Sequence, residues 1–173
     1  MQHFIVGLMF VIIIANAGWF VFFYNKTVNK KTKIEDRWKN IYDLIKLKYD
    51  IIENLVKKTH CVVNHEEEIR IWLAHSRSKL LKAQTPVEAI KISGELKEYL
   101  KTFSIDKTWN KDLEADPDFL QICIQIKKLD EKLALKQRIF KEEVFLYNKS
   151  INTFPNAIAA KIMNIRELHW GDS

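Results

Sequence analysis

Glycine and proline are scarce in this chain of 173 residues. There are four glycines and three prolines, and Gly94 is the only glycine between Gly18 and Gly171. Tight β-turns and phosphate-cradling loops both depend on glycine, so the composition argues against β-hairpins and nucleotide-binding loops. No segment shows the sustained alternation of apolar and polar residues that a half-buried strand requires. We therefore expect long helices and an all-α fold.

Cysteine is also scarce, with only Cys61 and Cys123 in the sequence. Both lie in segments with helical apolar patterning, where a free cysteine behaves as a small hydrophobic residue. Two cysteines fit a reducing compartment, and the sequence leaves a disulfide between them open. We interpret both as packing residues.

Charged side chains are absent from residues 4–23, and this absence is the most informative one. At about 1.5 Å per residue, such a helix just spans a hydrocarbon layer about 30 Å thick. Residues 1–24 are therefore predicted to be a transmembrane anchor. A basic segment follows the anchor at Lys26, Lys30, Lys31 and Lys33. The positive-inside rule then places the short N-terminus outside a cell or internal membrane and the C-terminal domain in the cytoplasm.

A cleaved signal peptide is the alternative to a retained anchor. The segment Ala15-Asn16-Ala17 fits the small-x-small cleavage pattern, and the sequence does not settle whether it is cut. Two features favour the retained anchor. No Lys or Arg precedes the apolar run, and the run continues past Ala17 through Trp19 to Tyr24.

The net charge of +6 arises in a chain where acidic and basic residues otherwise alternate. Only the segment just after the anchor is locally basic, and each basic residue near an anionic leaflet gains about 1 kcal/mol. We therefore predict that Lys26, Lys30, Lys31 and Lys33 contact lipid. Nucleic-acid binding is not predicted.

The first helix after the anchor is expected from about Thr27 to the low sixties, with continuity into the anchor left open. Its apolar positions follow steps of four and three, the spacing of a stripe that faces a partner helix. These positions are Ile34, Trp38, Ile41, Ile45, Lys48, Ile52, Leu55, Thr59 and Val62. We expect an interruption near Asn64-His65 before a helical pattern resumes at residues 69–80.

Two further helices begin at recognisable signals. Thr85-Pro86-Val87-Glu88 combines an N-cap, a first-turn proline and a capping box, and Asp116-Pro117 repeats the cap and proline. A loop is expected over residues 104–115. The last long helix keeps its apolar spacing until Pro155 ends it.

Residues 25–155 are therefore predicted to form an antiparallel bundle of three to four long helices. A short C-terminal helix or cap is expected over residues 156–173.

Lys48 and Lys136 fall on otherwise apolar stripes, where a charge needs a partner. Asp130 lies one position off the stripe of the last helix. We predict an internal ion pair that fixes the register of the helices.

No metal, cofactor or catalytic site is predicted. His60, Cys61, His65, Glu66 and His75 lack the i, i+3 or i, i+4 spacing that points two ligands at one ion. Adjacent residues on a helix, such as His60 and Cys61, diverge and do not form a nucleophile–base pair. No Gly-x-Ser-x-Gly motif occurs. We therefore expect a protein that is not an enzyme.

Several stretches together resemble the LemA family of bacterial membrane-anchored proteins. They follow one another in order and with compatible spacing. Residues 48–56 (KYDIIENLV) are similar to that family's RYDLIPNLV signature, and residues 147–155 (YNKSINTFP) to its closing YNxxIxxFP. Residues 112–113 and 119–121 resemble an intervening stretch. The resemblance runs from the anchor to about Pro155.

The chain departs from the family pattern in places, as a divergent member would. Glu53 stands where the signature has proline, and Phe140-Lys141 replaces a Tyr-Asn pair. The resemblance implies an external N-terminus, a cytoplasmic helical bundle and no established enzymatic activity. Some relatives are associated with magnetosome membranes, but no residue here selects that role.

A partner surface is expected from the resemblance together with helical geometry. Asp50 and Asn54 stand one turn apart off the buried stripe, and Tyr147 and Asn148 are the matching candidates on the last helix. We interpret the chain as a non-enzymatic scaffold that binds an unidentified protein. The alternative is a lipid-organising protein that acts through its juxtamembrane lysines. The process and the oligomeric state are left open.

Overall fold

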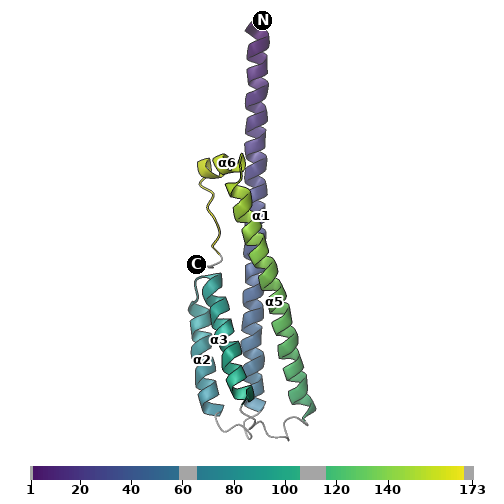
Figure 1. Ribbon diagram of the computed structural model, residues 1–173, viewed down its shortest axis with the longest axis vertical. Helices are drawn as coiled ribbons and strands as arrows, with labels where there is room; N and C mark the ends of the chain where they lie inside the picture. Colours follow the sequence, from purple (N-terminus) through teal and green to yellow (C-terminus); the bar gives the residue numbers. More distant parts are fainter. Residues whose placement is uncertain (1, 59–65, 106–115, 170–173) are drawn as a thin grey trace. The chain divides into compact units, whose positions relative to one another are not determined.

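The computed structural model describes residues 2–58, 66–105 and 116–169 (Figure 1). These residues form five helices and no strand: α1 (Gln2–Lys58), α2 (Glu66–Lys82), α3 (Pro86–Ile105), α5 (Pro117–Asn152) and α6 (Asn156–Ile162). The all-α prediction is therefore confirmed.

Helix α1 runs without a break from the apolar N-terminal segment into the helix expected after it. It is the one helix in the described part of the chain with the length and composition to cross a membrane. The apolar side chains from Phe4 to Ile14 are all more than half exposed. The helix also passes through Glu53 uninterrupted, as expected where a glutamate replaces a proline.

The chain divides into two compact units, each of which contains part of α1 and part of α5. The terminal unit comprises Met1–Arg37 and Phe140–His169, and the bundle unit comprises Trp38–Ile139. The bundle unit thus contains four helical segments, from α1, α2, α3 and α5, with α2 and α3 side by side in Figure 1. This arrangement agrees with the predicted number of bundle helices.

The core of the bundle unit lies where the apolar stripes predict it. Ile41, Ile45 and Ile52 of α1 are at most 1% exposed, and Leu80 and Leu96 are fully buried. Trp72 of α2 stacks on Tyr99 of α3 with ring centroids 3.9 Å apart, so it packs between these two helices. Offset aromatic stacking adds to the burial of two large side chains.

Lys48 of α1 and Asp130 of α5 form the ion pair predicted for the bundle. The Lys48 Nζ atom lies 2.6 Å from the Asp130 Oδ1 atom, and the Lys48 side chain is 2% exposed. Lys136, the other lysine on an apolar stripe, is half-buried.

Side-chain caps begin α3 and α5 as the sequence predicts. The Glu88 amide donates to the Thr85 hydroxyl, and the Asp118 amide donates to the Asp116 carboxylate. The Glu88 carboxylate accepts from the amide of Gln84 rather than from that of the cap residue, so the capping box is shifted by one residue. Helix α3 continues through Ile105, so the expected loop does not begin at residue 104.

The terminal unit is built from the start of α1, the end of α5, α6 and the segment 163–169. Its core contains Phe23 and Ile34 of α1, Val144 and Tyr147 of α5, and two alanines of α6. Helix α5 ends at Asn152, just before Pro155, and α6 is the short C-terminal helix that the sequence predicts.

Several sequence predictions fall outside the described residues. These concern His60, Cys61, the Asn64-His65 interruption and the loop over residues 106–115. Cys123 is described as a free, half-buried cysteine beside the Leu55–Phe119 cluster, which fits its interpretation as a packing residue.

Candidate functional site

Asp50 and Asn54 both lie on the exposed side of α1, away from the buried stripe. The stripe turns Ile45, Ile52 and Leu55 into the core. Asp50 and Asn54 each lie two positions from Ile52, so on a helix they point away from the face that Ile52 buries. The structure thus places this half of the predicted partner surface where another protein can reach it.

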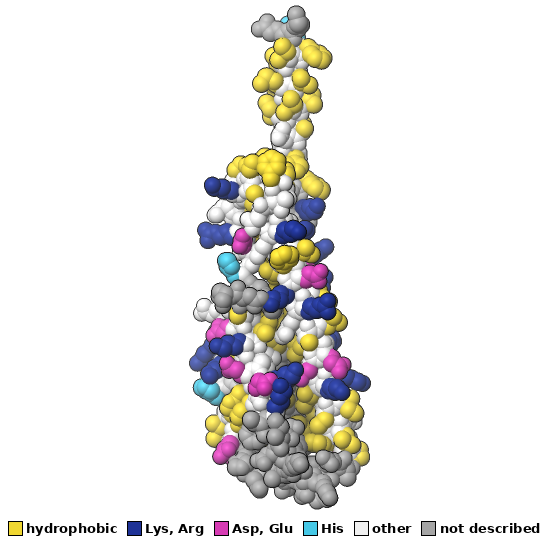
Figure 2. Space-filling view, viewed as in Figure 1, with side chains coloured by type: hydrophobic (Ala, Val, Ile, Leu, Met, Phe, Trp, Pro, Cys, Tyr) yellow, Lys and Arg dark blue, Asp and Glu magenta, His cyan; other side chains and the backbone are white. Residues whose placement is uncertain are grey.

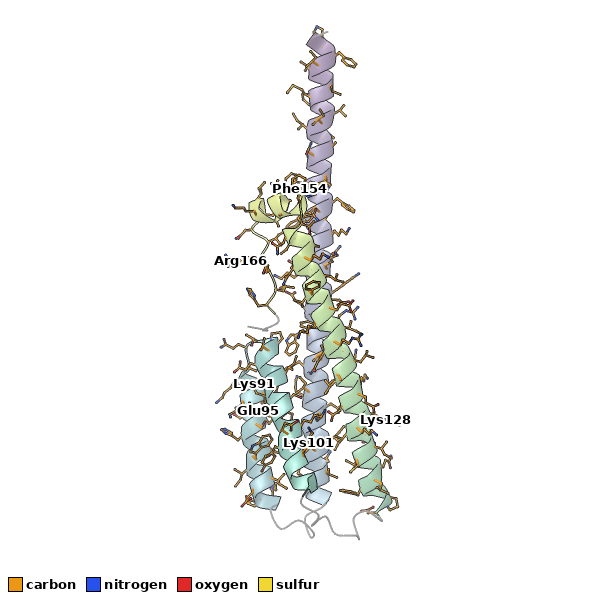
Figure 3. The ribbon with its side chains drawn as sticks, viewed as in Figure 1. Lys91, Glu95, Lys101, Lys128, Phe154 and Arg166 are labelled. Atoms are coloured by element: carbon orange, nitrogen blue, oxygen red, sulfur yellow. The ribbon has the colours of Figure 1, made fainter. Side chains whose placement is uncertain are left out.

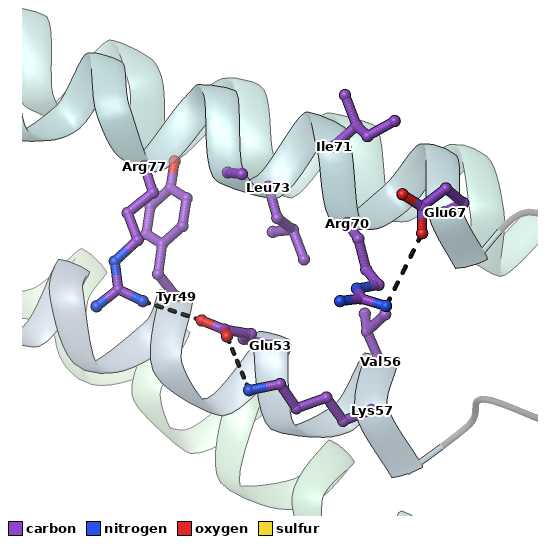
Figure 4. A pocket seen from close by; sticks show the side chains of 10 residues that line it. Tyr49, Glu53, Val56, Lys57, Glu67, Arg70, Ile71, Leu73 and Arg77 are labelled. Atoms are coloured by element: carbon purple, nitrogen blue, oxygen red, sulfur yellow. Dashed lines mark hydrogen bonds and ion pairs between the residues drawn. The ribbon is translucent and has the colours of Figure 1, made fainter.

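Arg77 of α2 links the two acidic residues on this side of α1. Its Nη2 atom lies 2.8 Å from the Asp50 Oδ1 atom, and its Nη1 atom donates to the Glu53 Oε2 atom at 3.0 Å. Glu53 also pairs with Lys57, with 2.9 Å between Oε1 and Nζ. Figure 4 shows Glu53 between Arg77 and Lys57. The four side chains therefore form one charged row.

The hydrogen bond from Lys57 is the main reason that the pKa of Glu53 lies below its usual value, and the Arg77 charge adds to this effect. Glu53 is therefore ionised at neutral pH. The row presents two carboxylates and two cations in fixed positions, although each exposed pair by itself contributes little to stability.

A groove of about 360 Å³ opens beside this row, between α1 and α2. Val56, Leu73 and Ala74 are among its apolar lining residues, and a further ion pair, between Arg70 and Glu67 at 3.8 Å, lies on its wall (Figure 4). Ile71, which also lines it, is 62% exposed. The groove therefore combines apolar surface with charges of both signs.

Tyr49 forms the deep part of the groove lining. Its hydroxyl lies 2.6 Å from the Ser76 hydroxyl, and both side chains are buried. Burial raises the pKa of Tyr49. A neutral, paired phenol holds α1 against α2 and is not poised to act as a base.

The described residues contain no group of three His, Cys, Asp or Glu side chains that could hold a metal ion. His75 is exposed on α2. The groove residues offer charge, hydrogen bonds and apolar surface to a ligand.

Tyr147 and Asn148 belong to a different unit from Asp50 and Asn54. They belong to the terminal unit, whereas the other two belong to the bundle unit. Tyr147 is 2% exposed, so its side chain is unavailable to a partner and we remove it from the candidate surface.

Asn148 holds the C-terminal segment against α5. Its Nδ2 atom donates to the Leu168 carbonyl at 2.7 Å, and its Oδ1 atom accepts from the Leu168 amide at 2.9 Å. Both polar atoms of the amide are thus used within the chain. We therefore interpret Asn148 as a structural residue before a partner-binding one.

The four juxtamembrane lysines are all exposed on α1. Lys31 pairs with Glu35 at 3.7 Å, and the Lys26 Nζ atom lies 5.7 Å from the Phe22 ring centroid. Lys30 and Lys33 line a small hollow with Glu143 and Leu146. Their exposure agrees with the predicted lipid contact without testing it.

Sequence analysis does not identify Arg77 as part of the surface, because its role depends on how α2 packs against α1. Arg77 is 24 residues from Glu53 in the chain. The sequence feature that points to Arg77 is its position next to Ser76, a polar residue in an otherwise apolar helical pattern.

Comparison with known families places the chain in context. The model of the LemA family matches residues 37–170, which is more than half of the chain. The match includes the groove and Asn148, and it begins after the apolar segment of α1. Comparison with curated proteins gave no match. Because the family model covers more than half of the chain, the chain is a member of the LemA family.

Proposed function

We propose that this protein is a non-enzymatic, single-pass membrane scaffold whose bundle unit binds another protein through the groove between α1 and α2. The apolar segment of α1 is the tether. The lysines that follow it favour a cytoplasmic bundle and an external N-terminus. Asp50 and Asn54 are the residues that we expect a partner to contact.

The observation that carries the proposal is the charged row beside an open apolar groove. Arg77 holds the carboxylates of Asp50 and Glu53 in place while each of these three side chains stays at least 41% exposed. A partner therefore meets charges whose positions are already set, which lowers the conformational entropy lost on binding.

The mixture of charges favours a protein partner over a nucleic acid. Nucleic-acid sites collect positive charge to neutralise phosphates. Here Arg77 and Lys57 alternate with Asp50 and Glu53. Protein interfaces combine an apolar centre with a polar rim, as this groove does. An amphipathic segment with charges of both signs on its edges fits best.

Crosslinked co-purification from native membranes tests the proposal. The full-length wild type is compared with Asp50→Ala/Asn54→Ala, and Glu98→Ala serves as the control because its carboxylate is exposed and pairs with Lys101 on α3. We expect a specific protein to be recovered with the wild type and the control but at least tenfold less with the double variant. Circular dichroism should show the same helicity for all three.

If the wild type and the double variant recover the same proteins in equal amounts, the proposal that Asp50 and Asn54 contact a partner is wrong. If the double variant unfolds instead, Asp50 and Asn54 are structural residues.

The exposed lysines after the apolar segment support a second candidate function, the organisation of anionic lipid. The dependence of binding on salt concentration distinguishes the protein-binding function from the lipid-binding function. The Debye length falls from about 10 Å at 0.1 M to about 3 Å at 1 M salt, so lipid contact through Lys26, Lys30 and Lys33 should weaken steeply. A packed protein interface should persist. Recovery of lipid alone, lost at high salt, would favour the lipid function.

A further inference from the structure

Helix α6 carries an apolar face that the terminal unit does not cover. Phe154, just before the helix, is 79% exposed, and Ile158 and Ile162 are 53% and 69% exposed. Ile158 and Ile162 are spaced by four, so they follow one side of the helix, and Phe154 lies in the turn that precedes it. Ala159 and Ala160, on the opposite side, are buried. The helix thus packs through its small residues and leaves its large ones outside.

This face lies where the apolar segment of α1 ends. Asn156, the first residue of α6, lines one small cavity together with Phe22, Phe23 and Lys26 of α1. Phe23 lies near the end of the uncharged run, and Lys26 is the first basic residue after it. If α1 spans a membrane, the start of α6 is therefore at the boundary between hydrocarbon and headgroups.

The orientation of α6 fits a position along that boundary. Within the terminal unit α6 lies crosswise to α1 (Figures 1 and 3). Hydrophobic side chains gather at this level, where the apolar part of α1 emerges, and basic side chains follow directly below (Figure 2). A helix perpendicular to a membrane span lies in the membrane plane.

Basic residues lie on α6 and on the parts of α1 and α5 in the same unit. Lys161 of α6 and Lys149 of α5 are exposed, and Lys26 and Lys30 line the cavity beside Asn156. Apolar residues next to lysines are the combination by which interfacial helices bind anionic membranes.

We propose that α6 is an interfacial membrane helix, and that Phe154, Ile158 and Ile162 insert into the headgroup–acyl boundary of an anionic lipid surface. The lipid surface thus contacts the chain twice, through the N-terminal span and through a second site more than 130 residues later in the sequence. The terminal unit is thereby held at a fixed depth and orientation. This inference rests on the membrane tether of the proposed function but not on its partner groove.

Spin-label accessibility in vesicles tests the inference. The full chain, with Cys61→Ala and Cys123→Ala, is reconstituted into vesicles made of equal parts phosphatidylcholine and phosphatidylglycerol. A nitroxide is attached at Phe154→Cys, Ile158→Cys or Ile162→Cys in turn. The control label is at Leu135→Cys, because Leu135 of α5 is 59% exposed and thus similar to Ile158. Accessibility to oxygen and to a water-soluble nickel complex is measured by power saturation.

We expect the three α6 labels to be accessible to oxygen and at least fivefold less accessible to nickel than the Leu135 label. Nickel accessibility equal to that of the control would overturn the inference. Labels shielded from both reagents would also overturn it, since they would be covered by protein rather than lipid.

A label at Val11→Cys separates failure of this inference from failure of the tether. If that label is reached by nickel, α1 does not span the bilayer, and both the tether and the inference fail. If it is protected while the α6 labels are exposed to nickel, only the inference fails. Circular dichroism of each labelled protein confirms that helicity is retained.

Discussion

The Nζ atom of Lys48 lies 2.6 Å from the Oδ1 atom of Asp130, with the lysine 2% and the aspartate 28% exposed. The lysine occupies a position of the α1 stripe whose neighbours Ile45 and Ile52 are fully buried. A charge in such surroundings is tolerated because its partner is fixed opposite it. We infer that the pair favours one register of α1 against α5 in the bundle unit.

Removal of Asp130 should destabilise the protein more than removal of Lys48. Asp130→Ala leaves a buried ammonium group without a partner, which costs about 3 kcal/mol, whereas Lys48→Met leaves a partly exposed carboxylate that water can reach. The double variant should lie closer to the wild type than Asp130→Ala does. Urea unfolding in detergent, followed by circular dichroism, measures these differences.

The control for this comparison is Glu131→Ala, because Glu131 is exposed and adjacent to Asp130. Its effect should stay within about 0.5 kcal/mol of zero. Equal effects of Asp130→Ala and Glu131→Ala would show that the ion pair does not carry the energy we assign to it.

The buried phenol of Tyr49 should make the bundle sensitive to alkali. Burial raises the pKa of Tyr49 above its ordinary value of 10.0. The folded state thus favours the neutral form, so the stabilisation is complete below about pH 10 and is lost as the pH rises through the raised pKa. The free energy of unfolding should fall above pH 10, and it should fall less steeply in Tyr49→Phe.

Tyr49→Phe also loses the hydrogen bond to Ser76, so it should be less stable by about 1 kcal/mol at neutral pH. Tyr24→Phe is the matched control, since Tyr24 is 47% exposed. Urea titrations at several pH values give the slope of the free energy of unfolding against pH for each variant. If Tyr49→Phe and Tyr24→Phe have the same slope above pH 10, another group controls the alkaline transition.

The sequence predicts those parts of the fold that depend on local spacing and local chemistry. The stripe through Ile41, Ile45 and Ile52 is buried as its period indicates, and Thr85 and Asp116 cap the helices that follow them. Even the Lys48–Asp130 pair can be predicted, because a charge on an apolar stripe needs a partner on a facing helix.

The candidate site could be predicted only in part. Helical geometry identifies Asp50 and Asn54 as exposed residues, but no spacing rule connects Asp50 with Arg77, which reaches it only through the packing of α2 on α1. Tyr147 fails as a surface residue for a related reason. A motif shared with a family does not distinguish a residue kept for binding from one kept for packing.

The side chain of Asn148 should control the order of residues 163–169. Its amide makes two hydrogen bonds to Leu168, at 2.7 and 2.9 Å. Asn148→Ala removes both bonds, so amide hydrogen exchange in this segment should become about tenfold faster, which corresponds to about 1.4 kcal/mol. Exchange in α2 and α3 should not change.

Lys149→Ala is the control for Asn148→Ala, because Lys149 is the exposed neighbour on the same helix. Exchange at Leu168 should be the same in Lys149→Ala as in the wild type. Unchanged exchange in Asn148→Ala would mean that Tyr147 and Asn152, which also bond to this segment, suffice to hold it.

Asn164 ends α6 in a left-handed backbone conformation, with φ at 51°. The Ile165 amide donates to the Ala160 carbonyl at 2.9 Å and the Asn164 amide to the Lys161 carbonyl, which together form a Schellman motif. Asn164→Val should weaken this end by about 1–2 kcal/mol because a β-branched residue resists positive φ, whereas Asn164→Gly should be neutral or slightly stabilising. Amide exchange at Ile165 reports the difference, and equal exchange in the Val and Gly variants would refute the assignment of this cap.

A frayed α6 would also disorder Ile162, so Asn164→Val should lower the protection of the Ile162 spin label while the label at Val11 stays protected.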